Sequence, residues 1–494
     1  MKKTVKAISI LLAFIMLLSC FGTTGFAFTE KAWDNYWQTD EAQLGLIMQP
    51  GSDESERNFS WYMPAGTKSC CVLVGTSPDL SDAECFYGRV IKTAQDDCAA
   101  KVTVTGLEEN TDYFYACLTD DEQSETYTFS TVSDEFSAMY VTDIHVSDGE
   151  SETSLKDHSK MFGEVVTQAA GKKNINLILS AGDQATRGKR CEYQGVVSAP
   201  VVRTVSFATC IGNHDRKGAD YKFFNNVPNE FYGTLNSYQG GDYWFTKGAC
   251  LFLVMDSNNG NGEGHSKFIK QAIAANPDAK WKIAVMHHDM YGQTMENRED
   301  ENKLIRLLWS QMFDENGIDL VLLGHSHYYS VSNVVYNGKS VQDVTPGCTV
   351  ENAQGTVYMV SGSINHPRSD EEFSYGDNIG IGVEDISKVM YNIIDFSSDA
   401  ITVHSYAYET GEEFNTFTLT KTDDAARPAF PFFRVILRML AGAIGKIYAF
   451  FNNFGRIYDL IQDGYDMNYL TDILNSRNTV DGKTFFEDYR FPVC

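Results

Sequence analysis

Residues 175–183 read Ile-Asn-Leu-Ile-Leu-Ser-Ala-Gly-Asp, an apolar run that ends in a Gly-Asp pair. Similar runs, separated by segments with helical periodicity, recur between residues 136 and 403. The runs cover 138–142, 175–180, 205–210, 251–255, 282–286, 320–323 and 357–360, and the helical segments cover 154–170, 266–275 and 302–316. Apolar strands that alternate with helices are typical of a sheet buried on both faces. The pattern therefore predicts an α/β domain over residues 136–410.

Short polar motifs lie along the same region, and most of them directly follow an apolar run. The motifs are Asp143-Ile-His145, Gly182-Asp183, Gly212-Asn213-His214-Asp215, His287-His288 and Gly324-His325-Ser326-His327. Six of the ten histidines fall inside them. In open α/β sheets, ligands bind beyond the carboxyl ends of the strands, so we expect these side chains to meet in one site. Together they supply enough Asp, Asn and His side chains to hold two metal ions that share one carboxylate.

Such a set of donor atoms suits the hydrolysis of phosphate esters. Two cations about 3.5–4 Å apart neutralise phosphate charge, activate a bridging water as hydroxide and hold it in line for attack. Oxygen and imidazole ligands suit Fe, Mn or Zn, and the motifs do not decide among these metals. No serine or cysteine motif of a covalent nucleophile accompanies them, which favours direct attack by metal-bound hydroxide.

The five motifs, in this order, resemble those of calcineurin-like metallophosphoesterases. With the β-rich segment that precedes them, residues 40–410 look most like the purple acid phosphatase branch of that superfamily. The resemblance implies a four-layer α/β (α+β) sandwich for the catalytic domain. It also implies the metal ligands, with Asp143, His145 and His327 at the first ion, Asn213, His287 and His325 at the second, and Asp183 as the bridge.

The resemblance gives roles to the residues after Asn213 as well. His214 would donate a proton or a hydrogen bond to the leaving oxygen, and Asp215 would orient its ring. Between the two adjacent histidines, His287 is favoured over His288 as the ligand because it directly follows an apolar run. Side chains of the same kinds outside these assignments are expected to have structural or surface roles, namely His158, His265, His366, His404 and Asp256.

One position departs from the purple acid phosphatase pattern. Those enzymes place a tyrosine three residues after the bridging aspartate, and its phenolate binds ferric iron and gives the colour. This chain has Thr186 there, and its first motif carries His145 where those enzymes have glycine. A histidine would thus replace the tyrosinate, and we predict a colourless enzyme. A strong visible charge-transfer band in the purified, metal-loaded protein would contradict this prediction.

Residues 40–133 read as an all-β module. Short alternating runs between turn residues predict about seven strands in a β-sandwich. The segments 105–107 and 111–115 resemble the late strands of a fibronectin type III domain. One or two disulfides are expected in this module, because an export signal precedes it and five of the eleven cysteines crowd there, namely Cys70, Cys71, Cys85, Cys98 and Cys117.

The two ends of the chain differ from the rest. Residues 1–27 have the lysines and the apolar core of a signal peptide, with an uncleaved anchor helix or a lipoprotein attached at Cys20 as alternatives. Residues 424–494 form a predicted helical tail, whose amphipathic helix either packs on the body or lies on a membrane or wall surface. The protein is therefore expected to be secreted or held at the cell surface.

Composition limits the partners. The apolar fraction of 43% and the charged fraction of 21% indicate a globular chain. A net charge of -26 disfavours binding to nucleic acid or to anionic membranes. The expected substrate is a small phosphate ester, foremost a monoester. A phosphodiesterase or nucleotide hydrolase of the same fold and an envelope-binding protein are the alternatives, and the oligomeric state is left open.

Overall fold

The computed structural model describes residues 44–93, 97–147, 152–218, 220–231, 241–292, 299–368, 375–383, 385, 387–422, 427, 436 and 440. The expected signal peptide lies outside these residues. So does the expected tail, except for positions 427, 436 and 440. Among the helices described, none is both long enough and apolar enough to cross a membrane.

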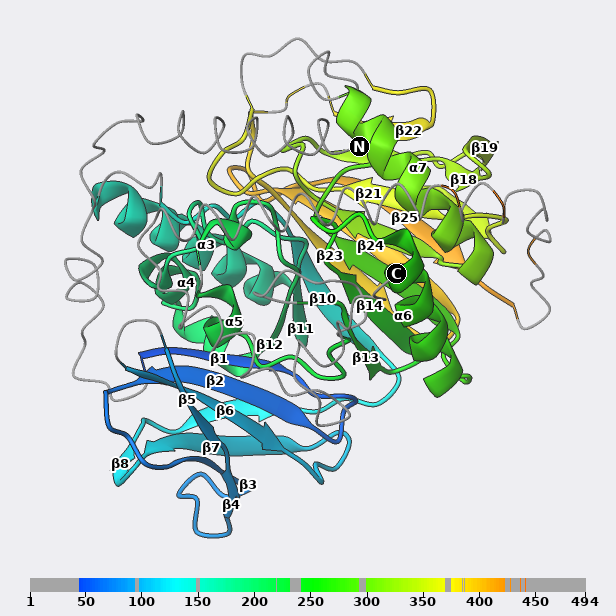
Figure 1. Ribbon diagram of the computed structural model, residues 1–494. Coiled ribbons are helices and arrows are strands. Elements are labelled where there is room, and N and C mark those ends of the chain that lie inside the picture. Colours follow the sequence, from blue (N-terminus) through cyan, green and yellow to red (C-terminus); the bar gives the residue numbers. More distant parts are fainter. Residues whose placement is uncertain are drawn as a thin grey trace, which may run out of the picture. The chain divides into compact units, whose positions relative to one another are not determined.

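The N-terminal module is a sandwich of two antiparallel sheets (Figure 1). One sheet has the order β1-β2-β6-β5, and the other has the order β4-β3-β7-β8 with β9 paired to β7. Trp61, Val72 and Tyr115 belong to the buried cluster between the sheets. The strands are β1 (Leu44–Pro50), β2 (Arg57–Met63), β3 (Cys70–Gly75), β4 (Glu84–Tyr87), β5 (Arg89–Lys92), β6 (Cys98–Val104), β7 (Asp112–Thr119), β8 (Glu122–Gln123) and β9 (Tyr127–Ser130).

The cysteines of this module are not cross-linked. All nine cysteines among the described residues are free thiols, so the expectation of one or two disulfides is corrected. Cys70, Cys98 and Cys117 belong to the core cluster, where a thiol packs as a small apolar group. Cys71 and Cys85 lie diagonally across neighbouring strands, because Leu73 is the residue opposite Cys85, and their thiols interact without a covalent bond. For Cys70, Cys98 and Cys117, the crowding of cysteines in the sequence therefore reflects core packing.

The second module contains two seven-stranded sheets that share the main core. Their orders are β12-β11-β10-β23-β24-β25-β20 and β13-β14-β15-β16-β21-β17-β22, and a β18-β19 hairpin is separate. The strands are β10 (Phe136–Val141), β11 (Leu177–Ser180), β12 (Ser206–Thr209), β13 (Tyr243–Lys247), β14 (Cys250–Met255), β15 (Trp281–Met286), β16 (Leu320–Leu323), β17 (Ser330–Ser332), β18 (Val334–Tyr336), β19 (Lys339–Gln342), β20 (Thr349–Glu351), β21 (Val357–Val360), β22 (Ile379–Gly382), β23 (Met390–Phe396), β24 (Ala400–Ala407) and β25 (Glu413–Thr420).

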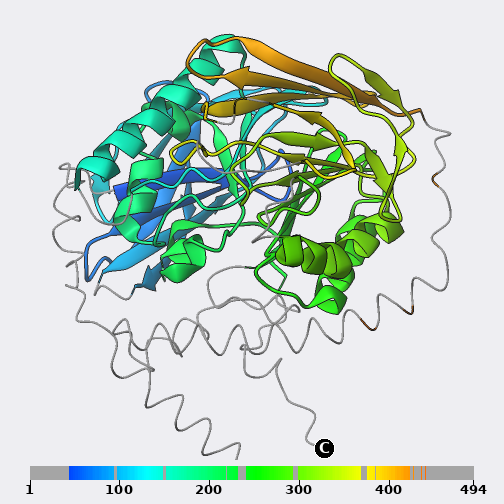
Figure 2. The same cartoon turned by 90° about the horizontal axis from the view of Figure 1, so that it is seen from above.

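Helices cover the outer faces of both sheets, which gives the expected four layers (Figure 2). Phe162 of one helix packs on Phe207 of β12 with ring centroids 6.2 Å apart. Phe268 and Trp309 pack on the outer face of the other sheet. The helices are α3 (Glu152–Lys172), α4 (Arg190–Val196), η2 (Pro200–Thr204), η3 (Asp215–Lys217), α5 (Tyr221–Phe224), α6 (Gly262–Ala275) and α7 (Glu299–Asn316).

The expected strands and helices agree with this architecture, but the C-terminal limit of the domain does not. β25 pairs with β24 along its whole length, and the two belong to the same sheet as β10. The expected boundary at residue 410 therefore falls inside the sheet. β24 alternates between buried and half-buried residues, so it lacks the continuous apolar run that marks the central parallel strands.

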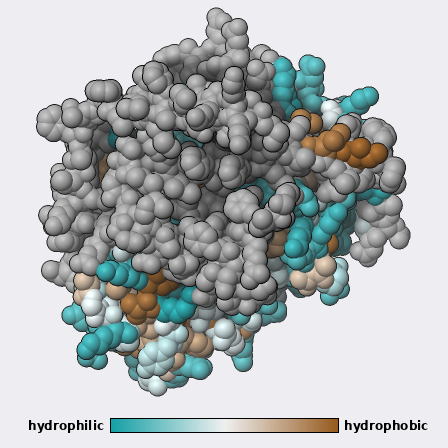
Figure 3. Space-filling view, in the orientation of Figure 1, coloured by the Kyte–Doolittle hydropathy of each residue, from teal (hydrophilic) through white to brown (hydrophobic). Residues whose placement is uncertain are grey.

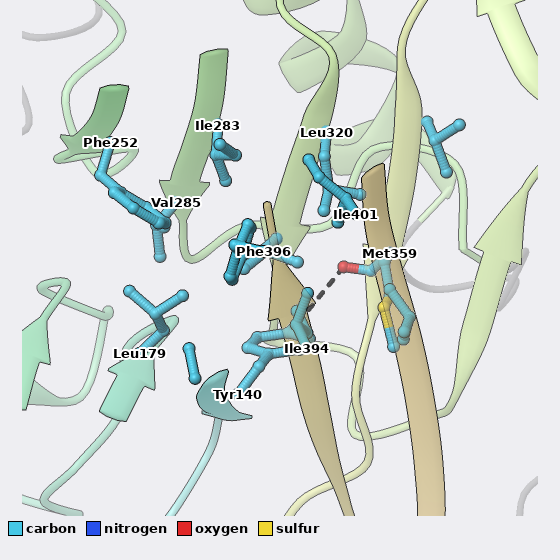
Figure 4. Packing of buried hydrophobic residues seen from close by; sticks show 14 of the residues in the cluster. Tyr140, Leu179, Phe252, Ile283, Val285, Leu320, Met359, Ile394, Phe396 and Ile401 are labelled. Carbon is cyan, nitrogen blue, oxygen red and sulfur yellow. Dashed lines mark hydrogen bonds between the residues drawn. The ribbon is translucent and has the colours of Figure 1, made fainter. Parts of the chain in front are cut away.

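Tyr140 ties the two sheets together directly beneath the strand ends (Figure 4). It lies in β10, and its hydroxyl reaches β16 and β21 of the other sheet. The backbone N–H groups of Leu323 (3.1 Å) and Ser361 (3.2 Å) donate to this oxygen. The hydroxyl in turn hydrogen-bonds the carbonyls of Leu323 and Met359. One buried side chain thus holds three strands at a fixed spacing.

Tyr140→Phe should lower the free energy of unfolding by about 2–4 kcal/mol, because two buried N–H groups lose their acceptor and each such loss costs about 1–3 kcal/mol. Urea unfolding followed by circular dichroism measures this difference. The matched control is Tyr391→Phe, whose buried hydroxyl donates to the side chain of Gln168 alone and should cost about 1 kcal/mol. Equal losses in the two variants would contradict the special role of Tyr140.

Candidate metal centre

The polar motifs meet where the carboxyl ends of strands from both sheets come together. In one sheet they follow β10, β11 and β12, and in the other they follow β15 and β16. The structure brings into this region all seven expected ligands, which are Asp143, His145, Asp183, Asn213, His287, His325 and His327.

Backbone hydrogen bonds continue past the strand ends and fix the loops to one another. The N–H of Asp143 donates to the carbonyl of Gly182, and the N–H of His145 donates to the carbonyl of Asp183, both at 2.9 Å. In the other sheet, the N–H of Gly324 donates to the carbonyl of His287 at 2.8 Å. The main chain therefore sets the relative positions of the motifs.

Five of the seven expected ligands have a left-handed backbone conformation. Their φ angles are 49° at Asp143, 47° at His145, 53° at Asp183, 73° at His325 and 61° at His327. A non-glycine residue in this region costs about 1 kcal/mol or more. Such strain persists only where the surroundings determine it, and it is concentrated at functional sites. In both the Asp-x-His and the His-x-His motif, the first and third residues carry it.

Glycines in three motifs make the close approach of these loops feasible. A Cβ atom added to Gly182 would lie 2.6 Å from the ring of His287. A Cβ atom on Gly212 would lie 2.1 Å from Asp183 Oδ1, and one on Gly324 would lie 2.7 Å from Asp143 Oδ2. Each glycine therefore makes room for a ligand side chain that comes from a different loop.

Asp143, His145 and His327 form the first group of donor atoms. Asp143 Oδ1 lies 3.1 Å from His327 Nε2 and 3.7 Å from His145 Nε2. Asp143 Oδ1 and His145 Nε2 are buried and make no hydrogen bond. Metal–ligand bonds of about 2.0–2.2 Å place neighbouring ligand atoms about 3 Å apart. The three side chains therefore fit one metal ion.

Asn213, His287 and His325 form the second group. Asn213 Oδ1 lies 2.9 Å from His287 Nε2 and 3.0 Å from His325 Nδ1, and the two ring nitrogens are 3.3 Å apart. Asp183 lies between the two groups, because its Oδ2 atom is 3.2 Å from His287 Nε2 and 3.5 Å from His145 Nε2. Its carboxylate is therefore placed to be shared by both.

Hydrogen bonds on the outer side of two rings fix which nitrogen faces the centre. Nδ1 of His287 donates to the carbonyl of Ala181 at 2.9 Å, and Nδ1 of His327 donates to the carbonyl of His366 at 2.8 Å. Because a carbonyl only accepts, Nε2 of each neutral ring presents a lone pair to the centre. There it meets the lone pairs of the carboxylates. A proton or a cation must lie between them.

The pKa values of Asp183 and His287 also indicate that positive charge is needed in the centre. Burial by itself would raise the pKa of Asp183, but the charge and hydrogen bond of His287 hold this pKa well below its ordinary value. Burial would lower the pKa of His287, yet Asp183 outweighs it and raises this pKa to about 9. The surroundings thus favour positive charge between Asp183 and His287.

His214 and Asp215 are arranged differently from what the resemblance implies. The backbone N–H of His214 donates to Asp183 Oδ1 at 2.7 Å, and its Nδ1 atom lies 2.8 Å from the carbonyl of Thr186. Asp215 Oδ2 instead accepts from the N–H of Gly212 at 2.9 Å. The expectation that Asp215 orients the His214 ring is corrected, because its carboxylate accepts from backbone N–H groups of the neighbouring loops. The Thr186 carbonyl and Lys217 Nζ, the latter at 2.7 Å, contact Nδ1 of the ring instead.

The remaining histidines have mostly structural surroundings. Nδ1 of His288 lies 2.8 Å from the hydroxyl of Ser257, so this atom is engaged outside the two groups of donor atoms. His265 pairs with Asp242 in the core, and His404 of β24 pairs with Asp395 of β23. Asp256 caps its own loop, where its Oδ1 atom accepts the N–H of Asn258 at 3.0 Å.

A cavity of about 380 Å³ opens onto the centre. His366 and Arg368 line it together with His214 and five of the seven expected ligands, namely His145, Asp183, Asn213, His325 and His327. The expectation that His366 is an ordinary surface or core residue is corrected, and Arg368 was not among the candidates. Several residues separate both from Val360, the end of β21, so a search directly after apolar runs misses them. The sequence signal that could have found them was the presence of basic residues shortly after the buried strand β21.

Comparison with known protein families agrees with this architecture. Residues 137–329 match the calcineurin-like phosphoesterase family, and residues 44–131 match the purple acid phosphatase N-terminal domain. Two uncharacterized proteins of Mycobacterium tuberculosis, from strains CDC 1551 / Oshkosh and H37Rv, are each 22% identical over 367 residues, which cover 64% of this chain and 68% of each relative.

A solved structure shows the same fold. The purple acid phosphatase PPD1 from seeds of yellow lupin (Lupinus luteus) superposes with a TM-score of 0.64 at 14% identity, over 78% of this chain and 76% of that chain.

Gly212→Ala should reduce the metal content and the activity at least about 10-fold, because the new methyl group would displace the Asp183 carboxylate, and overpacking of this kind typically costs about 1–3 kcal/mol. Elemental analysis of the purified protein measures the metal content. Gly171→Ala is the matched control, since its added Cβ would meet nothing within 4 Å. Equal metal content in both variants would contradict the role given to Gly212.

Proposed function

We propose that this chain, a phosphoester hydrolase that carries a calcineurin-like phosphoesterase domain behind a purple acid phosphatase N-terminal domain, is a secreted enzyme that hydrolyses small phosphate monoesters with a pair of metal ions. The observation that carries the proposal is the convergence of strained, buried ligands on one point. Groups of Asp and His donor atoms that all lie within 4.8 Å of one another recur around Asp143 and Asp183.

The metal ligands divide into two sets that share a carboxylate. Asp143, His145 and His327 would hold one ion, Asn213, His287 and His325 would hold the other, and Asp183 would bridge them. The buried Asp143 Oδ1 and His145 Nε2 atoms, which make no hydrogen bond, support this fit. When bound, Fe, Mn or Zn ions would act as Lewis acids on the phosphate and lower the pKa of water.

His214 is the residue of this chain best placed to act on the leaving group. Its ring borders the cavity, and a ring nitrogen lies within 4.8 Å of donor atoms of His145 and Asp183. Its backbone N–H donates to Asp183 Oδ1, and its Nδ1 atom lies against the Thr186 carbonyl and Lys217 Nζ. The other ring nitrogen would then hydrogen-bond or protonate the leaving oxygen. Asp215 acts indirectly, because its carboxylate positions the backbone of Gly212 and Ala185.

The metal ligands do not set the preference for monoesters over diesters, since the two reactions use the same ligands. Loops that border the cavity decide how many ester substituents fit beside the phosphate. Hydrolysis of an aryl phosphate, compared with a bis-aryl phosphate under the same metal loading, tests the preference. A higher kcat/KM for the diester would replace the proposal with a phosphodiesterase or nucleotide hydrolase of the same fold.

An envelope-binding role is the candidate from another class. The visible surface of the sandwich mixes hydrophilic and hydrophobic side chains in Figure 3, and Tyr87 is 78% exposed there. Such a mixed surface does not distinguish a binding module from an ordinary exposed one. The complete set of ligands favours catalysis instead, because a binding protein has no need to keep five strained donor residues.

Asp183→Asn should lower kcat/KM at least about 100-fold and reduce the bound metal, because it removes the shared charge. Changes merely next to a metal ligand typically cost about 10–100-fold. Activity on aryl phosphate and elemental analysis measure both effects. Asp385→Asn is the control, since Asp385 is exposed and its carboxylate accepts from Ser387 in a surface turn. Wild-type turnover by the Asp183→Asn protein would rule out the proposed site.

A further inference from the structure

The segment 366–368, outside every sequence motif, is built into the wall of the metal centre. Ser363 links this segment to the metal centre. Its hydroxyl donates to the carbonyl of Asp143 at 2.6 Å and accepts from the N–H of His366 at 3.0 Å. The side-chain amide of Asn365 donates to the carbonyl of Ile144 at 2.6 Å. The segment is thus tied to the backbone carbonyls of Asp143 and Ile144 in the Asp-x-His motif.

The same segment also positions a ligand from the other sheet. The carbonyl of His366 accepts from Nδ1 of His327 at 2.8 Å. The ring of His366 stands edge-on to the ring of His145, with centroids 5.1 Å apart. Pro367 then limits the backbone before Arg368. Arg368 follows this fixed stretch and lines the cavity beside the centre.

Arg368 brings positive charge to a cavity whose centre is acidic. The cavity is lined by His145, Asp183, Thr186, Asn213, His214, His325, His327, His366, Pro367 and Arg368. Among these described residues, Arg368 is the one whose side chain is cationic at every physiological pH. The chain as a whole carries a net charge of -26, so an anionic substrate gains little from long-range attraction. A local cation is what such a substrate needs.

We propose that Arg368 is a substrate-binding residue that contacts phosphate oxygens at the metal centre and favours the doubly charged phosphomonoester over the singly charged diester. The inference rests on the proposed function and specifies its substrate class. Guanidinium groups bind phosphate through two parallel hydrogen bonds, and the attraction grows with the charge on the phosphate. A monoester also presents three non-bridging oxygens to such a donor pair, one more than a diester.

The test compares Arg368→Met and Arg368→Lys with the wild type as metal-loaded full-length proteins. Arg368→Met should raise KM for an aryl phosphate about 10–100-fold and change KM for a bis-aryl phosphate at most about 3-fold. Its metal content should equal that of the wild type, because Arg368 is not a ligand. Arg368→Lys should recover part of the loss, since it restores the charge without the planar pair of donors.

Two further measurements separate this inference from the proposed function. Arg89→Met removes an exposed arginine of β5 and should leave both KM values unchanged. Binding of inorganic phosphate, measured by calorimetry, should weaken about 10–100-fold in Arg368→Met but not in Arg89→Met. This binding measurement needs no turnover.

Unchanged phosphate affinity and unchanged KM in Arg368→Met would overturn the inference while leaving the proposed function intact. An equal loss on both esters, or a loss of metal, would also overturn it, because Arg368 would then support the centre and not the choice of substrate. Failure of the wild type to hydrolyse any ester with metal bound would instead refute the proposed function.

Discussion

The main constraint on this structure is that lone pairs of buried histidine nitrogens and carboxylate oxygens face one another in the metal centre. Nε2 of His287 points at Asp183, and Nε2 of His327 points at Asp143, with outer hydrogen bonds that hold each ring in that orientation. Such contacts are repulsive unless positive charge lies between them. Left-handed backbone at five ligands adds about 1 kcal/mol or more at each position, and together these are comparable to the net stability of a domain.

The rest of the fold provides the energy and the rigidity that this arrangement needs. The core between the two sheets supplies the burial that opposes the strain, with contributions from β10, β11 and β14 through β16. Tyr140 fixes the distance between the two sheets, because it joins β10 to Leu323 and Ser361 just before the ligands of both sheets begin. Glycines at the turns then let the loops approach closely, because a ligand side chain of another loop occupies the space where a Cβ atom of the glycine position would lie.

Much of this could be predicted from the sequence, and the reasons for the exceptions are physical. Continuous apolar runs identified the parallel strands, and the polar residues directly after them identified the donors, because both signals are local. The orientation of Asp215 could not be predicted, since it depends on which backbone N–H groups of other loops lie within reach. His366 and Arg368 were missed for a similar reason: their nearness to the centre is set by tertiary bonds through Ser363 and Asn365.

The acidity of the chain and the anionic nature of the proposed substrate are compatible once distance is considered. At physiological ionic strength, exposed charges are screened beyond about 8 Å, so most of the surface acids exert little force inside the cavity. Within it, buried Asp143 and Asp183 would repel a phosphate until cations offset them, which makes metal binding a condition for substrate binding as well as for catalysis. Arg368 differs from such cations because it is part of the chain and is present whatever the metal content. A fixed guanidinium beside exchangeable ions can therefore set a preference among phosphate esters independently of which metal the centre holds.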